Sequence, residues 1–150
     1  MDKILDIDNV DLKIISLLNE DAKTPYTEIA KKVFVSSGTV HVRMKKLEDM
    51  GVVKSATLNI DFSKLGYDIS AFLGIYLEKS SLYDTVIEKL KGIAEVVSAY
   101  YTTGNYSIFA KIICRDTNHL RLVLDKIQKV DGIDRTETLI VLEESINRPI

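Results

Sequence analysis

The chain has 150 residues, of which 46% are hydrophobic and 28% are charged, with only 7 glycines and 2 prolines. This composition is typical of a folded protein and excludes low-complexity, collagenous and disordered classes. Apolar stretches such as residues 71–77 are far shorter than the roughly 18 residues that a membrane span needs, and the charged first residues show no targeting signal. The single cysteine, Cys114, lies in an apolar run, so we expect a buried thiol and a cytoplasmic protein.

The small net charge of −2 hides an uneven distribution along the chain. Residues 1–30 contain seven acidic residues and three lysines, a net charge of −4, whereas residues 31–54 contain six cationic and two acidic residues, a net charge of +4. A basic segment within an acidic protein indicates one localised surface for an anionic partner.

The first 50 residues predict three short helices. Asp8 is suited to cap the first helix, and Ser36 is suited to cap a third helix that ends near Met50. Thr24 is suited to cap the second helix, with Pro25 at the first position of that helix. The connection between the second and third helices is so short that they must cross steeply, which predicts a helix-turn-helix.

After the helices the hydrophobic pattern changes to a period of two, which predicts a short strand or wing at residues 52–60. The chain beyond it predicts a strand, a helix, two strands, a helix and a strand, at residues 69–77, 81–92, 95–103, 106–115, 116–129 and 134–143. This order is typical of the ferredoxin-like fold, an antiparallel sheet with helices on one face. We therefore expect an α+β protein with a winged helix-turn-helix domain at residues 1–60 and a ferredoxin-like βαββαβ domain at residues 61–150.

Both faces of the expected sheet carry apolar residues. Ile108 and Ile112 share one face of their strand, and Phe109 and Ile113 share the other. The second domain is too short to supply a layer for both faces. We therefore expect the open face to pack on another subunit.

The third helix carries the strongest functional signal. Its core face is formed by Val40, Met44 and Leu47, which leaves small and polar residues on the N-terminal half, where a recognition helix meets base edges. Arg43 is suited to read guanine through two hydrogen bonds, and the nearby lysines are suited to hold phosphates. The predicted contact surface for double-stranded DNA consists of Ser37, Gly38, Thr39, His41, Val42, Arg43, Lys46, Lys31 and Lys32. The alternative is an ordinary amphipathic helix with a solvated basic face.

Residues 99–107 are chemically unusual, because tyrosines and small hydroxylated residues surround a Gly-Asn turn between two apolar strands. Hydroxyl groups and turn amides can hold a carboxylate, and Glu137 in the last strand can accept from an ammonium group. These features predict a site for a small polar effector at the subunit interface, made of Tyr100, Thr102, Thr103, Gly104, Tyr106, Ser107, Thr136, Glu137 and Thr138. The alternative is a plain hairpin with cross-strand tyrosine and threonine pairs.

Other chemistries find little support in the sequence. His41, His119 and Cys114 lie far apart and form no metal-binding motif, so we expect neither a metal site nor a cofactor. No pairing of nucleophile and base and no glycine-rich phosphate loop stands out, so we expect no enzymatic activity. The alternative function is a ferredoxin-like metabolic enzyme or allosteric module without DNA binding, in which the helices serve only for assembly.

Several runs of residues together resemble one protein family. They are the I-D-x-x-D-x-x-I-I-x-x-L motif that begins at Ile7, the R-x-x-x-L-E-x-x-G-V-V run that begins at Arg43, and the A-Y-Y-T-T-G segment that begins at Ala99. These runs are similar to those of the Lrp/AsnC, or feast/famine, transcription regulators, and most similar to the asparagine-responsive members. The resemblance covers essentially the whole chain.

The resemblance implies a sequence-specific regulator of amino-acid metabolism whose assembly and DNA binding respond to a small amino acid, with asparagine as the expected effector. It also implies a homodimer that assembles further, for example into an octamer, with no membrane partner. Many members of the family carry acidic residues at the positions of Asn105 and Ser107, which are neutral here. A neutral loop repels a ligand carboxylate less, and Ser107 fits the asparagine-type pattern.

Overall fold

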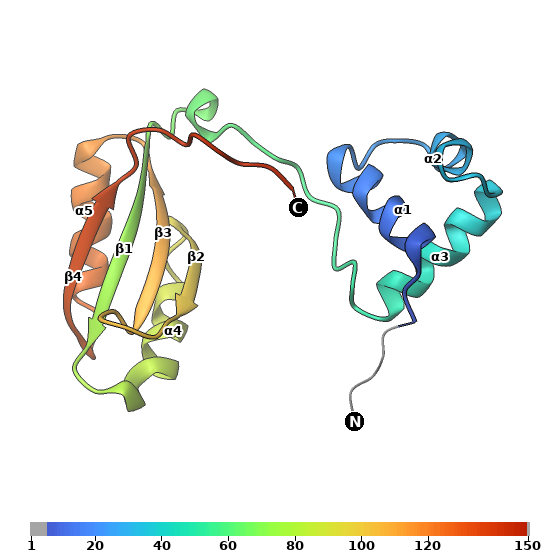
Figure 1. Cartoon of the computed structure of the whole chain (residues 1–150). Helices are drawn as coiled ribbons and strands as arrows, with labels where there is room; N and C mark the ends of the chain where they lie inside the picture. The colour runs from blue at the N-terminus through green and yellow to red at the C-terminus, as the bar shows by residue number, and fades with distance from the viewer. Residues whose placement is uncertain (1–5, 150) are drawn as a thin grey trace. The chain divides into compact units, whose positions relative to one another are not determined.

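The computed structural model describes residues 6–149, which form two compact units (Figure 1). The first unit contains the chain up to Asn59 together with the segment from Ile146 onward, and the second unit contains Ile60–Ser145. The last residues of the domain expected at residues 61–150 therefore group with the first unit. No helix within residues 6–149 is long and apolar enough to cross a membrane.

Three helices form the first unit, namely α1 (Asn9–Glu20), α2 (Tyr26–Val33) and α3 (Ser37–Asp49). Their apolar faces meet in one core, in which Ile14 and Leu47 are completely buried. Only residues 34–36 connect α2 to α3. The helix-turn-helix predicted from this short connection is confirmed.

Side-chain caps determine where two of these helices begin. Asp8 and Asp11 form a reciprocal capping box at α1, in which each carboxylate accepts from the backbone N–H of the other residue. Ser36 caps α3 by accepting a backbone N–H of the first turn at 3.1 Å. The expected cap at Thr24 is wrong, because Pro25 occupies the cap position of α2 and the Thr24 hydroxyl donates to a carbonyl of the preceding turn.

The short strand expected at residues 52–60 does not form. Gly51 follows α3 with a φ of +72°, and the residues after it pair with no strand in the described part of the chain. A lone extended segment leaves its backbone donors and acceptors without ladder partners, so an alternating pattern alone does not produce a strand.

The second unit is an antiparallel sheet of four strands with two helices packed on one face (Figure 1). In chain order its elements are η1 (Phe62–Leu65), β1 (Ile69–Leu77), η2 (Ser80–Leu82), α4 (Tyr83–Lys91), β2 (Val96–Tyr101), β3 (Ile108–Cys114), α5 (Thr117–Gln128) and β4 (Ile133–Ile140), where η marks a 3-10 turn. The spatial order is β2-β3-β1-β4. This arrangement matches the predicted βαββαβ order, and the expected α+β fold class is confirmed.

Alternate residues of the strands face the helices and form the larger core. Leu73 and Ile75 of β1 pack there with Val86 of α4 and Val123 of α5, and all four are completely buried. Cys114 belongs to the same core, as expected from the sequence, and burial raises the pKa of its thiol. Because side chains alternate along a strand, the residues between these positions lie on the other face.

That other face, here called the open face, is covered by neither α4 nor α5. Phe72 of β1 stacks on Phe109 of β3 with ring centroids 5.4 Å apart. Their cross-strand partners Tyr100 and Leu139 extend the apolar surface to the two edge strands and are 62% and 51% exposed. The chain by itself thus covers one face of the sheet fully and leaves the other incompletely covered.

Candidate functional site

The surface of α3 that faces away from the core is accessible along its N-terminal half. Of the predicted DNA contacts in this half of the helix, Gly38, His41 and Val42 are exposed, and Ser37 and Thr39 are half-buried. The His41 ring packs edge-on against Tyr26 of α2 with ring centroids 4.5 Å apart. The helix therefore presents small, polar and apolar groups on a surface that a neighbouring helix supports.

A long basic stretch surrounds this surface. Residues 29–47 include five cationic residues and no acidic one. Lys31 and Lys32 are exposed in the last turn of α2, and Lys32 lies 3.3 Å from Glu28 in a surface ion pair. Such exposed pairs are weak, so Lys32 can exchange its partner at little cost. A phosphate backbone placed along residues 29–47 would meet only cationic and neutral side chains of that stretch.

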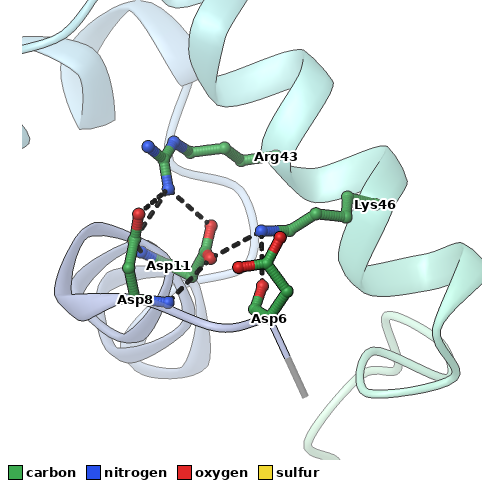
Figure 2. A network of polar contacts seen from close by, with 5 residues as sticks. All are labelled: Asp6, Asp8, Asp11, Arg43 and Lys46. Atoms are coloured by element: carbon green, nitrogen blue, oxygen red, sulfur yellow. Dashed lines mark hydrogen bonds and ion pairs between the residues drawn. The ribbon is translucent and has the colours of Figure 1, made fainter. Parts of the chain in front are cut away.

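Arg43 and Lys46 are held by acidic residues near the start of α1, and Figure 2 shows both side chains reaching from α3 toward them. The Arg43 guanidinium donates to both carboxylate oxygens of Asp8 at 2.7 Å and to Asp11 at 3.0 Å. The Lys46 ammonium donates to the other oxygen of Asp11 at 2.9 Å and to the backbone carbonyl of Asp6 at 2.8 Å. We call these five residues the α1–α3 network.

Asp11 is the one buried charged residue within residues 6–149, with no exposed surface. A buried carboxylate is tolerated when it is paired and hydrogen-bonded. Burial pushes the pKa of Asp11 upward, but hydrogen bonds from Lys46, from the backbone of Asp8 and from Arg43 outweigh burial and lower it. Asp11 therefore remains ionised and ties α1 to α3.

The α1–α3 network gives Arg43 and Lys46 a role that local sequence patterns did not reveal. The partners of Asp11 lie 32 and 35 residues further along the chain, beyond the reach of any local pattern. The side chains of Arg43 and Lys46 are 25% and 34% exposed, so DNA would compete with two carboxylates for them. Contact of either residue with DNA stays a prediction.

Glu137 of β4 is the centre of a polar cluster on the open face. Its carboxylate accepts from the hydroxyl of Tyr106 at 2.6 Å and from the hydroxyl of Tyr76 at 3.2 Å. The hydrogen bond to Glu137 raises the pKa of the Tyr106 phenol. The Arg135 guanidinium lies over the Tyr76 ring, 4.0 Å from its centroid. This cluster, here called the Glu137 cluster, brings together a carboxylate, two phenols and a guanidinium, groups that can bind an ammonium and a carboxylate.

Gly74 of β1 makes the close packing of this cluster possible. A Cβ at this position would overlap the Tyr106 ring, which lies directly over the strand backbone. A glycine inside a strand is a signal for such a close approach, and this one could have directed attention to Tyr106 and its neighbours. The sequence gives no signal for Tyr76, and it gives no role to Arg135 beyond its place next to Thr136 and Glu137, because the strand register alone brings these two residues together.

The predicted effector residues of β4 do not all lie together. Thr136 and Thr138 pair with Ile75 and Leu73, whose side chains are buried against the helices. Directly paired residues point to the same face of a sheet. The two threonines therefore lie on the opposite face from Glu137, and their inclusion in one cluster with it is wrong.

The remaining predicted effector residues lie in or beside the β2–β3 hairpin. The Thr102 hydroxyl donates to a loop carbonyl at 3.0 Å, and its backbone N–H donates to the carbonyl of Ser107 at 3.1 Å. Thr103 and Gly104 are exposed at the tip, where Gly104 has a φ of +97°. Tyr100 is exposed on the open face. The hairpin therefore presents exposed polar groups at its tip, next to a base that is held by hydrogen bonds.

Metal-binding residues do not gather anywhere in the described part of the chain: no three His, Cys, Asp or Glu side chains converge. His119 accepts the backbone N–H of Arg115 through Nδ1, and its Nε2 lies 3.0 Å from Glu95. The contact with His119 lowers the pKa of the Glu95 carboxyl. An accepting Nδ1 leaves Nε2 as the donor, so His119 links α5 to the segment before β2.

Comparison with known proteins identifies the family. A family model described as Lrp/AsnC ligand binding domain matches residues 70–150, and one described as winged helix-turn-helix DNA-binding matches residues 7–54. The chain is 49% identical to Regulatory protein AsnC of Haemophilus influenzae over 96% of this chain and 97% of that protein. It is 46% identical to Regulatory protein AsnC of Escherichia coli over 96% and 95%. The chain belongs to the Lrp/AsnC family.

Solved structures of Lrp/AsnC proteins share its fold. The structure of E. coli AsnC matches with a TM-score of 0.90 at 45% identity, covering 96% of this chain and 97% of that one. A feast or famine regulatory protein from M. tuberculosis, complexed with L-methionine, matches with a TM-score of 0.87 at 26% identity, covering 93% and 95%. The family, the fold class and the function as a DNA-binding transcription regulator, all expected from the sequence, are confirmed.

The Asp8 carboxylate should contribute to stability in a pH-dependent way. Its pKa is lowered from 3.8 to about 2, above all by the hydrogen bond from Arg43, so folding favours the charged form. This stabilisation is complete above about pH 4 and is lost as the pH falls toward about 2. We expect Asp8→Asn to lower the urea midpoint of unfolding near neutral pH, with the difference from wild type shrinking toward zero at about pH 2.

The matched control is Asp49→Asn in the same unit, whose carboxylate is exposed and pairs with Lys45 at 3.3 Å. This control should leave the urea midpoint nearly unchanged, since exposed ion pairs contribute little. A midpoint difference for Asp8→Asn that does not depend on pH would contradict the role assigned to its ionised carboxylate.

Proposed function

We propose that this chain binds DNA as a homo-oligomer and regulates genes of amino-acid metabolism in response to a small amino acid, with asparagine as the effector. The observation that carries the proposal is the accessible N-terminal half of α3, set within the basic and acid-free residues 29–47. The M. tuberculosis relative complexed with L-methionine supports an amino-acid ligand. The similarity of residues 99–104 to asparagine-responsive members supports asparagine.

The proposal includes neither catalytic activity nor a cofactor. The relatives are regulatory proteins, which supports this assignment over a metabolic enzyme. The proposed function also implies a cytoplasmic location, because the DNA partner would be accessible there.

Base reading is assigned to the accessible part of α3. Thr39 and His41 can form hydrogen bonds with base edges, and Val42 can contact a thymine methyl group. Gly38 has no side chain, which permits the start of α3 to approach the DNA closely. Lys31 and Lys32 are assigned to phosphates, which position the protein without reading sequence. The proposed DNA surface thus consists of Ser37, Gly38, Thr39, His41, Val42, Lys31 and Lys32.

Arg43 and Lys46 are assigned a positioning role, which revises the expectation that Arg43 reads guanine. Releasing Arg43 would leave the buried Asp11 carboxylate with less compensation, and removal of one partner from a buried pair costs about 3–5 kcal/mol. A new bidentate contact with guanine contributes about 1–3 kcal/mol to the discrimination between bases, which is less than this cost. The balance favours an α1–α3 network that stays closed when DNA is bound.

The amino-acid site is assigned to the open face, between the Glu137 cluster and the tip of the β2–β3 hairpin. Each oxygen of the Glu137 carboxylate has a second lone pair, so it can accept from an ammonium while it keeps both tyrosine hydroxyls. Arg135 supplies a cation for the ligand carboxylate. The proposed set is Tyr100, Thr102, Thr103, Gly104, Tyr106, Ser107 and Glu137, joined by Tyr76 and Arg135.

The open face is also assigned to the dimer interface. Phe72, Phe109, Tyr100 and Leu139 form a continuous apolar surface that a second copy would cover. Removing such surface from water contributes about 25 cal/mol per Å². A dimer would place two recognition helices for half-sites about 34 Å apart, or a multiple of that, and further assembly of dimers, for example into an octamer, would multiply these contacts.

The salt dependence of DNA binding tests the assignment of the basic residues. The probe is a duplex that the wild-type protein selects from a random-sequence pool, and binding is followed by fluorescence anisotropy. We expect Lys32→Gln to reduce the slope of log K against log salt concentration by about one, because one phosphate contact is lost. The control Lys129→Gln, in the second unit, should leave both slope and affinity unchanged. Failure of the wild type to select any sequence would overturn the proposed function.

Arg43→Gln separates positioning from base reading. We expect it to weaken binding by a similar factor for every single-base variant of the selected duplex, because a tilted α3 loses contacts generally. The measurement is a competition assay over all single-base variants. Loss of sequence preference at one base position alone would show that Arg43 reads that base and would contradict the positioning role.

Asparagine binding, measured by isothermal titration calorimetry, tests the Glu137 cluster. We expect Tyr106→Phe and Glu137→Gln to weaken it at least tenfold, since each removes a hydrogen-bonding or charged group of the cluster. The control is Tyr101→Phe, because Tyr101 packs on Tyr83 at the other face of the sheet. Unchanged binding by Glu137→Gln would move the site elsewhere, and no binding by the wild type at millimolar concentration would remove asparagine as the effector.

Light scattering tests the interface. We expect Leu139→Asp to convert the oligomer to smaller species at micromolar concentration, because a carboxylate would be buried in an apolar contact. Leu122→Asp is the matched control, since Leu122 is similarly exposed but lies on α5. An unchanged mass for Leu139→Asp would exclude the open face as the interface.

A further inference from the structure

Phe34, in the turn between α2 and α3, has an unusual backbone conformation. Its φ of 60° and ψ of 44° lie in the left-handed region, and it is the one non-glycine residue with positive φ within residues 6–149. Bulky side chains are disfavoured there, and glycine or asparagine usually takes such a position at the end of a helix. The Phe34 side chain is also 92% exposed.

The turn needs this backbone conformation but does not need the phenyl ring. The backbone N–H groups of Phe34 and Val35 both donate to the carbonyl of Ala30, which ends α2 and reverses the chain. Val35 then packs against the core of the first unit. A glycine would allow the same path without strain. The ring therefore adds strain to the turn and gains almost no burial in return.

The surroundings of Phe34 in the chain fit an anionic partner. Lys31 and Lys32 precede it on the last turn of α2, and Ser36 follows it as the cap of α3. The whole stretch of residues 29–47 lacks an acidic residue. In helix-turn-helix proteins the first residues of the recognition helix approach the major groove, so a side chain three residues before that helix lies near the sugar-phosphate edge of the groove.

We propose that the Phe34 ring packs against deoxyribose groups of duplex DNA at the edge of the groove that α3 enters. This inference rests on the proposed DNA-binding function and adds an apolar contact to it. Deoxyribose carbons lie between successive phosphates, so an exposed ring that closely follows two lysines can contact sugar carbons while the lysines pair with the phosphates. Backbone strain persists at positions where a functional contact offsets its cost.

The test compares Phe34→Gly and Phe34→Asn with wild type, using the selected duplex and a mixed-sequence duplex of equal length. Both replacements suit the left-handed backbone, so we expect a melting temperature at least as high as that of the wild type. We expect Kd for both duplexes to rise about fivefold, because the apolar contact is lost. The slope of log K against log salt concentration should not change, because no charge is removed. Phe34→Tyr keeps the ring and should bind as the wild type does.

Three results would overturn the proposal. A Kd within twofold of wild type for Phe34→Gly would show that the ring makes no stabilising contact with DNA, and would point to a protein partner instead. A lower melting temperature for both replacements would show that the ring supports the fold. A changed salt slope would show that the replacements disturb phosphate contacts. Failure of the wild type to bind either duplex is a separate outcome, seen before any variant is compared, and it would overturn the proposed function itself.

Discussion

The structure of the DNA-binding unit depends on one buried carboxylate. Asp11 has no exposed surface and is neutralised by Arg43 and Lys46, both of which come from the recognition helix. An unpaired charge at this depth would be strongly destabilising, so the two helices must keep the geometry that satisfies it. The same constraint uses Arg43 and Lys46 of α3 internally and leaves its N-terminal half accessible. The division of α3 into an anchored and a free part follows from this single burial.

The ligand-binding unit depends on a different constraint, the alternation of side chains along its strands. One set of residues completes a core under α4 and α5, and the other set forms the open face. The register decides which polar residues can act together: Glu137 joins Tyr76 and Tyr106, whereas Thr136 and Thr138 are separated from them by the sheet itself. An apolar surface and a polar cluster therefore share one face. Subunit association and ligand binding would use neighbouring parts of it.

Local chemistry in the sequence predicted most of the fold. Caps such as Asp8 and Ser36 and the change of hydrophobic period gave the helices and the strand order, because both depend on neighbouring residues. Interactions between residues far apart in the sequence could not be predicted from such local patterns. The Asp8 to Arg43 contact joins residues 35 apart, and the Tyr106 to Glu137 bond joins residues 31 apart. The strand expected at residues 52–60 failed for the same reason, since a strand needs a partner that its own pattern does not specify.

The absence of a side chain at Gly74 has a mechanical consequence. The Tyr106 ring lies on the backbone of β1, and Ser107 beside it donates to the carbonyl of Ile75 in the same strand. β1 is paired to both β3 and β4, so it is one of the two central strands of the sheet. A molecule that displaced the Tyr106 ring would therefore remove a contact at the centre of the sheet and not one on a free loop. Gly74 thus ties the position of the hairpin to the middle of the sheet.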